Sequence, residues 1–133
     1  MRLWSHNFRM RYSISFQSNL TAIPHRYTQG IYMAELNVYF KLDDDVFVWN
    51  AEKAKENRRK HGIRFEQACE VFHDPSNIFV DASTPSDDRA AAIGYTTEGS
   101  MLFVVHIERR DGMIRIISAR LAEPKERSLY EDG

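Results

Sequence analysis

Cysteine is nearly absent from this chain, and its scarcity narrows the possible chemistry. The 133 residues include one cysteine, Cys69, which excludes an internal disulfide and a metal site built from cysteines. Cys69 has apolar neighbours and is expected to be a small buried hydrophobe in a protein of the reducing cytoplasm. Long apolar runs are missing too. The longest, residues 101–105, has the length of a strand, whereas a membrane-spanning helix needs ~20 residues.

Neither sign of charge is in clear excess. The chain has 18 Lys and Arg against 19 Asp and Glu, which gives a formal net charge of −1. Bulk electrostatics therefore do not draw the whole molecule to a polyanion, and any contact with nucleic acid needs a local basic patch. The length and the hydrophobic fraction of 43% predict one domain with its own core.

Acidic residues are missing from positions 1–34, which sets the start of the chain apart from the rest. This stretch contains arginines and scattered serines, but no hydrophobic period persists in it. We interpret residues 1–45 as an N-terminal extension that ends in a polar linker, Leu42–Asp45. Three origins stay open: sequence upstream of a true start at Met33, an organellar transit peptide, or an arm that is poorly ordered or depends on a partner.

Regular patterns begin at Val46 and predict a domain over residues 46–133. Asn50 suits the N-cap of a helix at 51–60, and Gly62 suits its C-terminal end. Strands that follow helices favour an α+β fold with an antiparallel meander and a C-terminal helix. The other expected elements are a strand at 46–49, a helix at 65–72, strands at 77–81, 89–95, 101–107 and 114–119, and a helix from Pro124 to Glu131.

The last third of the domain gathers groups that suit a phosphate-bearing ligand. Arg115, Arg120 and Arg127 lie within one strand–turn–helix segment that ends at Tyr130. Arginine suits phosphate because its planar fork donates paired hydrogen bonds to phosphate oxygens. These residues predict a surface that holds phosphate.

A second basic segment spans residues 53–64. Lys53, Asn57 and Lys60 have the i, i+4, i+7 spacing that places side chains on one helical face. Glu52 and Glu56 interleave with them, so an ordinary solvated face stays an open alternative.

The two segments resemble the BrnT family of ribonuclease toxins, which have a RelE-like fold. The resemblance covers residues 46–133 and none of 1–45, and its most specific part is the pair of blocks Lys60–Gly62 and Ile117–Arg120. One departure is Asn50, where the family usually has Asp, although both residues cap helices. The other matching residues are Phe47, Val48, Trp49, Lys53, Asn57, Ile63, Phe65, Ala68, Phe72, His73, Asp74, Arg89, Ile93, Gly94, Arg115, Ile116, Ala122, Glu126, Arg127 and Tyr130.

The resemblance implies a toxin of a type II toxin–antitoxin pair that cuts RNA without a metal ion or other cofactor. It also implies silencing by a BrnA-like ribbon-helix-helix antitoxin. Operator DNA would be contacted only through that antitoxin, and no membrane would be involved.

Such RNA cleavage requires removal of the 2′-hydroxyl proton, stabilisation of a phosphorane and protonation of the 5′-oxygen. His61 and Lys60 are the candidates for proton transfer. His61 is the better one, at the helix end, although it could instead cap the helix and cover Trp49. The expected phosphate stabilisers are Arg89, Arg120 and Arg127, and the expected RNA contacts are Lys53, Asn57, Arg115 and Tyr130.

Glu126 and Tyr130 share a helical face and have open roles. Glu126 could act as a base, but orientation of Arg120 or Arg127 is favoured, and a salt bridge to Glu126 is the main rival role for Arg120. Tyr130 could stack on a base or pack the last helix onto the sheet.

The sequence offers two other functions, a metal-dependent nuclease and a binding module. A metal-dependent nuclease would use aspartates and His73, but Asp74, Asp81, Asp87 and Asp88 follow no ligand spacing, and His106 is expected to be structural. A catalytically weak binding module that holds the antitoxin and tunes repression is the alternative to an enzyme.

Overall fold

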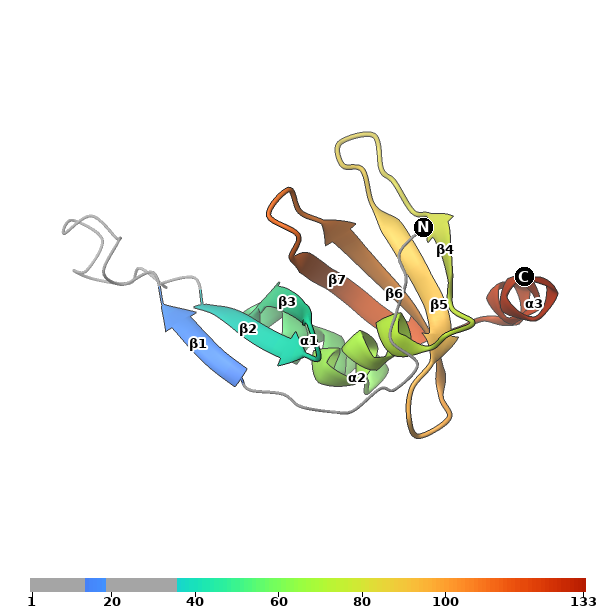
Figure 1. The fold of residues 1–133 in the computed structure, drawn as a ribbon, viewed down its shortest axis with the longest axis horizontal. Coiled ribbons are helices and arrows are strands. Elements are labelled where there is room, and N and C mark those ends of the chain that lie inside the picture. Colours follow the sequence, from blue (N-terminus) through green and yellow to red (C-terminus); the bar gives the residue numbers. More distant parts are fainter. Residues whose placement is uncertain (1–13, 19–35) are drawn as a thin grey trace.

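The computed structural model describes the backbone of residues 14–18 and the whole of residues 36–133. Figure 1 shows a sheet with α1 and α2 against its part around β3 and β7, and with α3 at its β4–β5 end. The arginines of the expected extension and Met33 lie outside the described residues. The elements are β1 (Ile14–Ser18), β2 (Leu36–Leu42), β3 (Asp45–Asn50), α1 (Ala51–His61), α2 (Phe65–Glu70), the 3-10 helix η3 (Val71–His73), β4 (Ile78–Asp81), β5 (Ala90–Tyr95), β6 (Met101–Glu108), β7 (Ile114–Leu121) and α3 (Pro124–Asp132).

The sheet order is β1-β2-β3-β7-β6-β5-β4, and the α+β class with its antiparallel meander is confirmed. One pairing is parallel: Phe47 and Val48 of β3 lie beside Ile114 and Arg115 of β7. Through this pairing, β7 joins the meander β4–β7 to the β2–β3 hairpin, although β3 and β7 lie far apart in the sequence. Local patterns could not reveal this pairing, because no turn connects the two strands.

Aromatic side chains fill the core between the sheet and α1, α2 and η3. Trp49 is buried and its ring lies 5.7 Å from the rings of both Phe40 and Phe65. Burial of each large side chain contributes roughly 1.5–3 kcal/mol, so this cluster anchors the helices on the sheet. Cys69 is fully buried, as expected, and burial raises the pKa of its thiol well above the ordinary value.

The prediction of a polar linker at Leu42–Asp45 is wrong. These residues form the turn of a hairpin, in which β2 pairs with β3 from Asn37↔Asn50 to Leu42↔Asp45. Asp43 has the left-handed φ of 53° that tight turns tolerate in Asp. Val38, Phe40 and Leu42 alternate into the core, so the packed unit begins before the expected boundary at Val46.

The expected helix ends are confirmed. The Asn50 side chain accepts hydrogen bonds from the backbone N–H groups of Glu52 and Lys53, at 2.9 and 3.0 Å. Gly62 takes φ 72° and donates its N–H to the Arg58 carbonyl, closing the helix at the position where glycine is favoured. Within the described part of the chain, no helix has the length and apolarity to cross a membrane.

Candidate active site

A buried asparagine joins the two basic segments. The Asn57 Nδ2 donates to the carbonyls of Ala119 and Ile63, at 2.9 and 3.1 Å, and its Oδ1 accepts from the Ala119 N–H at 3.0 Å. Asn57 is 6% exposed, and its amide is engaged at both ends. Its expected role as an RNA contact does not fit this geometry, because the amide connects α1 to β7.

The position of this bridge follows from the sheet. Strand β3 pairs with β7 only at Ile114 and Arg115, and then the chain turns into α1 at Ala51. The backbone of Ala119, further along β7, would otherwise lack a neighbour on that edge. Asn57 supplies the missing donors and acceptor, which a buried strand edge requires. The His61 block and the Arg120 block therefore meet at Ala119.

The outer surface of α1 is cationic and largely unpaired. Lys53, Arg58 and His61 are exposed, and no ion pair engages them among the described residues. Glu56 holds Arg59 at 2.6 Å and Lys60 more loosely at 3.8 Å. The hydrogen bond from Arg59 lowers the pKa of Glu56 and raises that of Arg59. A phosphate backbone could therefore contact Lys53 and the C-terminal turn of α1 without displacing a strong internal partner.

His61 does not fill the structural role that the sequence left open. Gly62 closes the helix, and Phe40 and Phe65 contact the ring of Trp49. The imidazole is exposed at the C-terminus of α1, beside the bridge to Ala119.

The side chain of Arg120 points away from α1 and α2. Ala119 is buried in the core beneath α1, and successive strand residues point to opposite faces, so Arg120 lies on the other face of the sheet. Its guanidinium forms a two-bonded pair with Glu126, with both N–O distances 2.8 Å, and also donates to the Leu121 carbonyl. The guanidinium carbon stands 4.3 Å from the centre of the Phe103 ring.

Glu126 holds Arg120 in this place. Its carboxylate also accepts the Glu123 N–H at 2.7 Å. Hydrogen bonding from Arg120 lowers the pKa of Glu126, and the same bond raises the pKa of Arg120. The geometry is that of orientation, the role favoured from the sequence, and a carboxylate held in this way is a poor base at neutral pH.

Tyr130 fixes the far end of α3. Its hydroxyl donates to Asp74 Oδ2 at 2.8 Å, and its ring meets Tyr95 edge-on at 5.3 Å. Burial, followed by the bond to Asp74, raises the pKa of Tyr130 to about 12. Asp74 Oδ2 also accepts the Tyr95 N–H. Between base stacking and packing of the last helix, these contacts fit packing.

The remaining expected phosphate ligands are dispersed. Arg89 precedes β5 and binds Asp87 at 3.1 Å, at the opposite end of that strand from Tyr95. Arg115 lies near the start of β7 on the same sheet face as Arg120, and Arg127 is exposed on α3. The structure therefore places Lys60 and His61 at the end of α1 and Arg120 on the opposite face of the neighbouring strand β7, and it leaves Arg89 apart.

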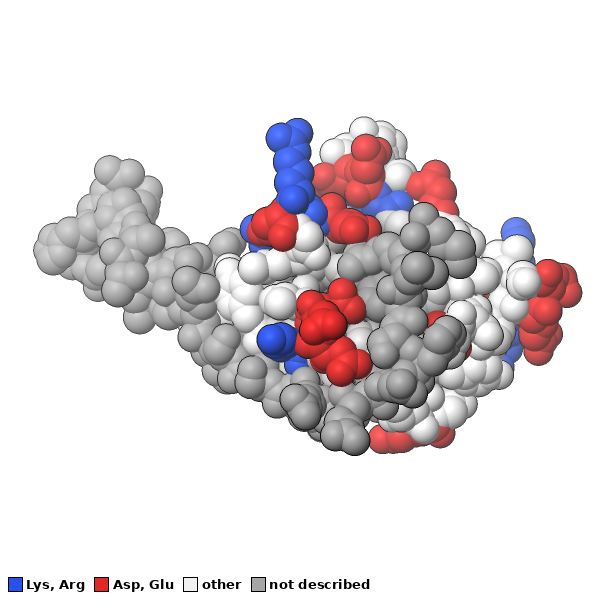
Figure 2. Space-filling view, in the orientation of Figure 1, with Lys and Arg blue, Asp and Glu red and all other residues white. Residues whose placement is uncertain are grey.

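Surface charge is mixed on the side of the molecule shown in Figure 2. Acidic and basic side chains of the described residues are interspersed there, in keeping with the net charge of −1. Attraction of a polyanion would therefore require a local set of cations, such as the exposed ones on α1.

Carboxylates and histidines do not converge on a metal-like site within residues 36–133, where no group of three or more potential ligand residues is found. Asp74 is engaged by Tyr130, Tyr95 and Ser76. His73 lies buried between two carboxylates of the β2–β3 turn, 3.4 Å from Asp43 and 3.3 Å from Asp45. His106 is buried and contacts Phe72 edge-on, which agrees with its expected structural role.

Sequence reasoning missed two contributors. Phe103 supports Arg120, and a signal for it existed in the cross-strand pairing of 101–107 with 114–119 through the short Asp111-Gly112 loop. The Asp74–Tyr130 contact joins residues 56 positions apart and had no local signal.

A comparison with protein families agrees with this geometry. The family model described as "Ribonuclease toxin, BrnT, of type II toxin-antitoxin system" matches residues 49–126, more than half of the chain. That range contains α1, the Asn57 bridge and the Arg120–Glu126 pair. No curated protein gives a significant match to the chain. The chain thus belongs to the BrnT family of ribonuclease toxins of type II toxin–antitoxin systems.

Proposed function

We propose that this toxin cleaves RNA without a metal ion, at the edge where α1 meets β7. One observation carries the proposal: Asn57 binds both backbone groups of Ala119 and so holds His61 beside the strand that carries Arg120. His61 then lies on the α1 side of this part of β7, and Arg120 lies on the opposite face of the same strand. The single buried cysteine is compatible with a cytoplasmic setting, where RNA is the available substrate.

The chemistry is an internal transfer. The 2′-oxygen attacks the adjacent phosphorus, and His61 takes the 2′-hydroxyl proton. The bond from phosphorus to the 5′-oxygen breaks, and His61 gives its acquired proton to that oxygen, leaving a 2′,3′-cyclic phosphate and a 5′-hydroxyl. Lys60 stabilises the charge on the phosphorane, because 58% of its side chain is exposed and its ion pair with Glu56 is loose.

The flanking RNA backbone runs along cations for which no ion pair is found in the part of the chain that the structure describes. Lys53 contacts phosphates on the α1 side, and Arg127 does so on the α3 side. Arg115 extends this contact along the open face of the sheet. Each neutralised phosphate releases counterions, so binding weakens as salt rises.

The antitoxin in this proposal is a BrnA-like ribbon-helix-helix protein that covers the same edge. The exposed cations of α1 offer a surface for its acidic side chains, and cover there would block His61. Operator DNA is reached only through the antitoxin, because the toxin has a net charge of −1 and a mixed surface.

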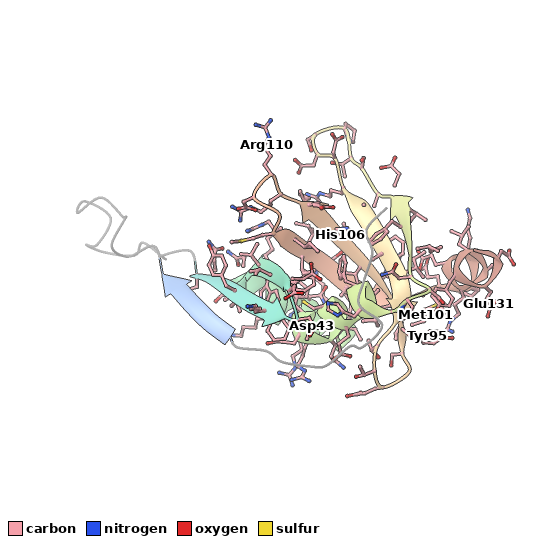
Figure 3. All side chains as sticks on the ribbon, viewed as in Figure 1. Asp43, Tyr95, Met101, His106, Arg110 and Glu131 are labelled. Atoms are coloured by element: carbon pink, nitrogen blue, oxygen red, sulfur yellow. The ribbon has the colours of Figure 1, made fainter. Side chains whose placement is uncertain are left out.

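The test is cleavage of end-labelled RNA by the full chain in excess EDTA. We expect the parent protein to cleave and His61→Gln to lose about 10²- to 10⁴-fold in rate, the usual contribution of a positioned proton carrier. Arg110→Gln is the matched control, because Arg110 sits at the tip of the β6–β7 hairpin, away from the bridge (Figure 3). Loss of cleavage in EDTA, or equal cleavage by His61→Gln, would contradict the proposal.

A second candidate is a binding module with weak catalysis. It is favoured by the internal engagement of Arg120, Glu126 and Tyr130, three of the expected site residues. Expression of the full chain without an antitoxin separates the two functions. An enzyme arrests growth and His61→Gln relieves the arrest, whereas a pure binding module leaves growth unchanged in both cases.

A further inference from the structure

The hydrogen-bonding edge of Arg120 is already occupied. Nη1 donates to the Leu121 carbonyl at 3.1 Å and to Glu126 Oε1 at 2.8 Å, and Nη2 donates to Glu126 Oε2 at 2.8 Å. Glu126 also neutralises the charge. The two nitrogens that would hold a phosphate end-on are therefore engaged, and Arg120 is a weak phosphate ligand in this arrangement.

The flat faces of the guanidinium differ from each other. One face lies over the Phe103 ring, with 4.3 Å between the guanidinium carbon and the ring centre. The Arg120 side chain nevertheless remains 30% exposed. Glu123 Oε1 also stands 3.9 Å from Nη2. With one face on Phe103 and the end-on edge on Glu126, these contacts leave the outer face of the plane and the aliphatic stem uncovered.

The plane is also held rigidly. Phe103 and Arg120 are direct cross-strand partners on β6 and β7, and the Glu126 side chain is only 13% exposed. The two-bonded pair fixes rotation of the guanidinium, and the ring beneath adds a cation–π contact. A planar group that is already fixed loses little entropy when a ligand covers it.

We infer that the outer face of Arg120 is a stacking platform for one unpaired base of the RNA substrate. This rests on the proposed function, because an RNA that reaches His61 on the α1 side must pass from there to the opposite sheet face to cover Arg120. Bases in single-stranded RNA stack on guanidinium planes. Because the end-on donors are occupied, the platform tolerates different bases and selects single-stranded over paired RNA.

The experiment uses the full chain and a short RNA that carries 2′-O-methyl groups at every position, so that no cleavage can occur. 2-Aminopurine replaces each base in turn, and its quenching on binding reports stacking. We expect strong quenching at one position and its loss in Arg120→Lys, with affinity about 5- to 150-fold weaker. Lysine keeps the charge, so the dependence of binding on salt stays the same.

An RNA with an abasic site at the quenched position completes a double-mutant cycle, in which the base and the guanidinium are removed singly and together. The abasic RNA should lose a similar factor with the parent protein and almost nothing further with Arg120→Lys. Phe103→Leu removes the support and leaves the Arg120–Glu126 pair, so it is the second variant if Arg120→Lys unfolds. It should reduce quenching at the same position, while Arg110→Lys should bind as the parent does.

Additive losses in the cycle, or undiminished quenching in Arg120→Lys and Phe103→Leu, would overturn the inference. Unchanged RNA binding together with weaker antitoxin binding would assign the platform to the protein partner and overturn it too. Failure of the proposed function looks different: the parent would not cleave ordinary RNA in EDTA, yet quenching and the cycle would still report stacking.

Discussion

The two basic segments contain similar residues and use them differently. On α1, Lys53, Arg58 and His61 are exposed, and the described residues provide no ion pair for them. Around α3, Arg120 binds Glu126 in two places and Tyr130 binds Asp74. The cations of the first segment are left open to solvent, whereas the second segment uses most of its hydrogen bonds to hold a helix in place.

The difference has a physical origin in packing. Helix α1 is held by the core and by Asn57, so its outer side chains are not needed for its attachment. Helix α3 has no fully buried residue, and its attachment depends on polar contacts at its two ends. A cation therefore becomes available for function where apolar burial already fixes its backbone.

The junction between the two segments should give the largest effect. Asn57→Asp removes the two donated hydrogen bonds and places a charge against the carbonyls of Ala119 and Ile63. We expect the free energy of unfolding, measured with urea, to fall by about 3 kcal/mol. The matched control is Asn50→Asp, because the Asn50 cap uses only its acceptor oxygen and a helix start favours negative charge. Equal losses in both variants would show that the bridge does not hold α1.

A smaller effect should separate the half-buried ion pair from the exposed one. Glu126→Gln should lower the free energy of unfolding at pH 7 by about 1–2 kcal/mol, because a charge-assisted pair is weakened. Glu56→Gln on α1 should change stability little, since the pair of Glu56 with Arg59 is exposed. If both variants behave alike, the proposed contrast between the segments fails.

The same pair sets a pH dependence. The pKa of Glu126 is lowered in the folded protein from its ordinary value of 4.5, so its stabilisation is full above that value. It is lost as pH falls through the lowered pKa. Urea titrations of the parent and of Glu126→Gln should therefore converge in acid and separate towards neutral pH.

The smallest effect concerns the far end of α3. Tyr130→Phe removes the bond to Asp74 and should cost about 1 kcal/mol. With a pKa raised to about 12, Tyr130 stabilises the fold fully below its ordinary pKa of 10.0 and loses that contribution as pH rises through 12. Absorbance titration should show one late phenolate that Tyr130→Phe abolishes. Tyr95→Phe is the control, because Tyr95 contacts Asp74 through its backbone N–H.

Much of the fold was predictable because its signals are local. Asn50 and Gly62 mark the ends of α1 by side-chain and backbone geometry, and the Asp111-Gly112 turn announces the β6–β7 hairpin. Strand β2 was missed although Val38, Phe40 and Leu42 alternate with polar or amphipathic residues. The acid-poor sequence before β2 favoured the interpretation of residues 1–45 as an extension, so the alternation within β2 was not assigned to a strand.

The candidate site was predictable only in part. His61 and Lys60 carry their chemistry in their identity, and the paired blocks pointed to the right family. The prediction that Asn57 contacts RNA rested on its helical spacing with the neighbouring lysines. Spacing alone does not tell that its amide turns inward to Ala119. Arg89 was included for its charge, yet sheet register sets it at the opposite end of β5 from Tyr95, with Asp87 as its partner.

By itself, the sequence determined the helices, the meander, the lack of a disulfide and the set of cations, because caps, turns and periodicity act over a few residues. Only the tertiary structure decided which cations stay free. The parallel meeting of β3 and β7 placed Ala119 beneath α1, and the return of α3 placed Glu126 on Arg120 and Tyr130 on Asp74. Such contacts join residues distant along the chain, and their energies depend on burial that no local pattern encodes.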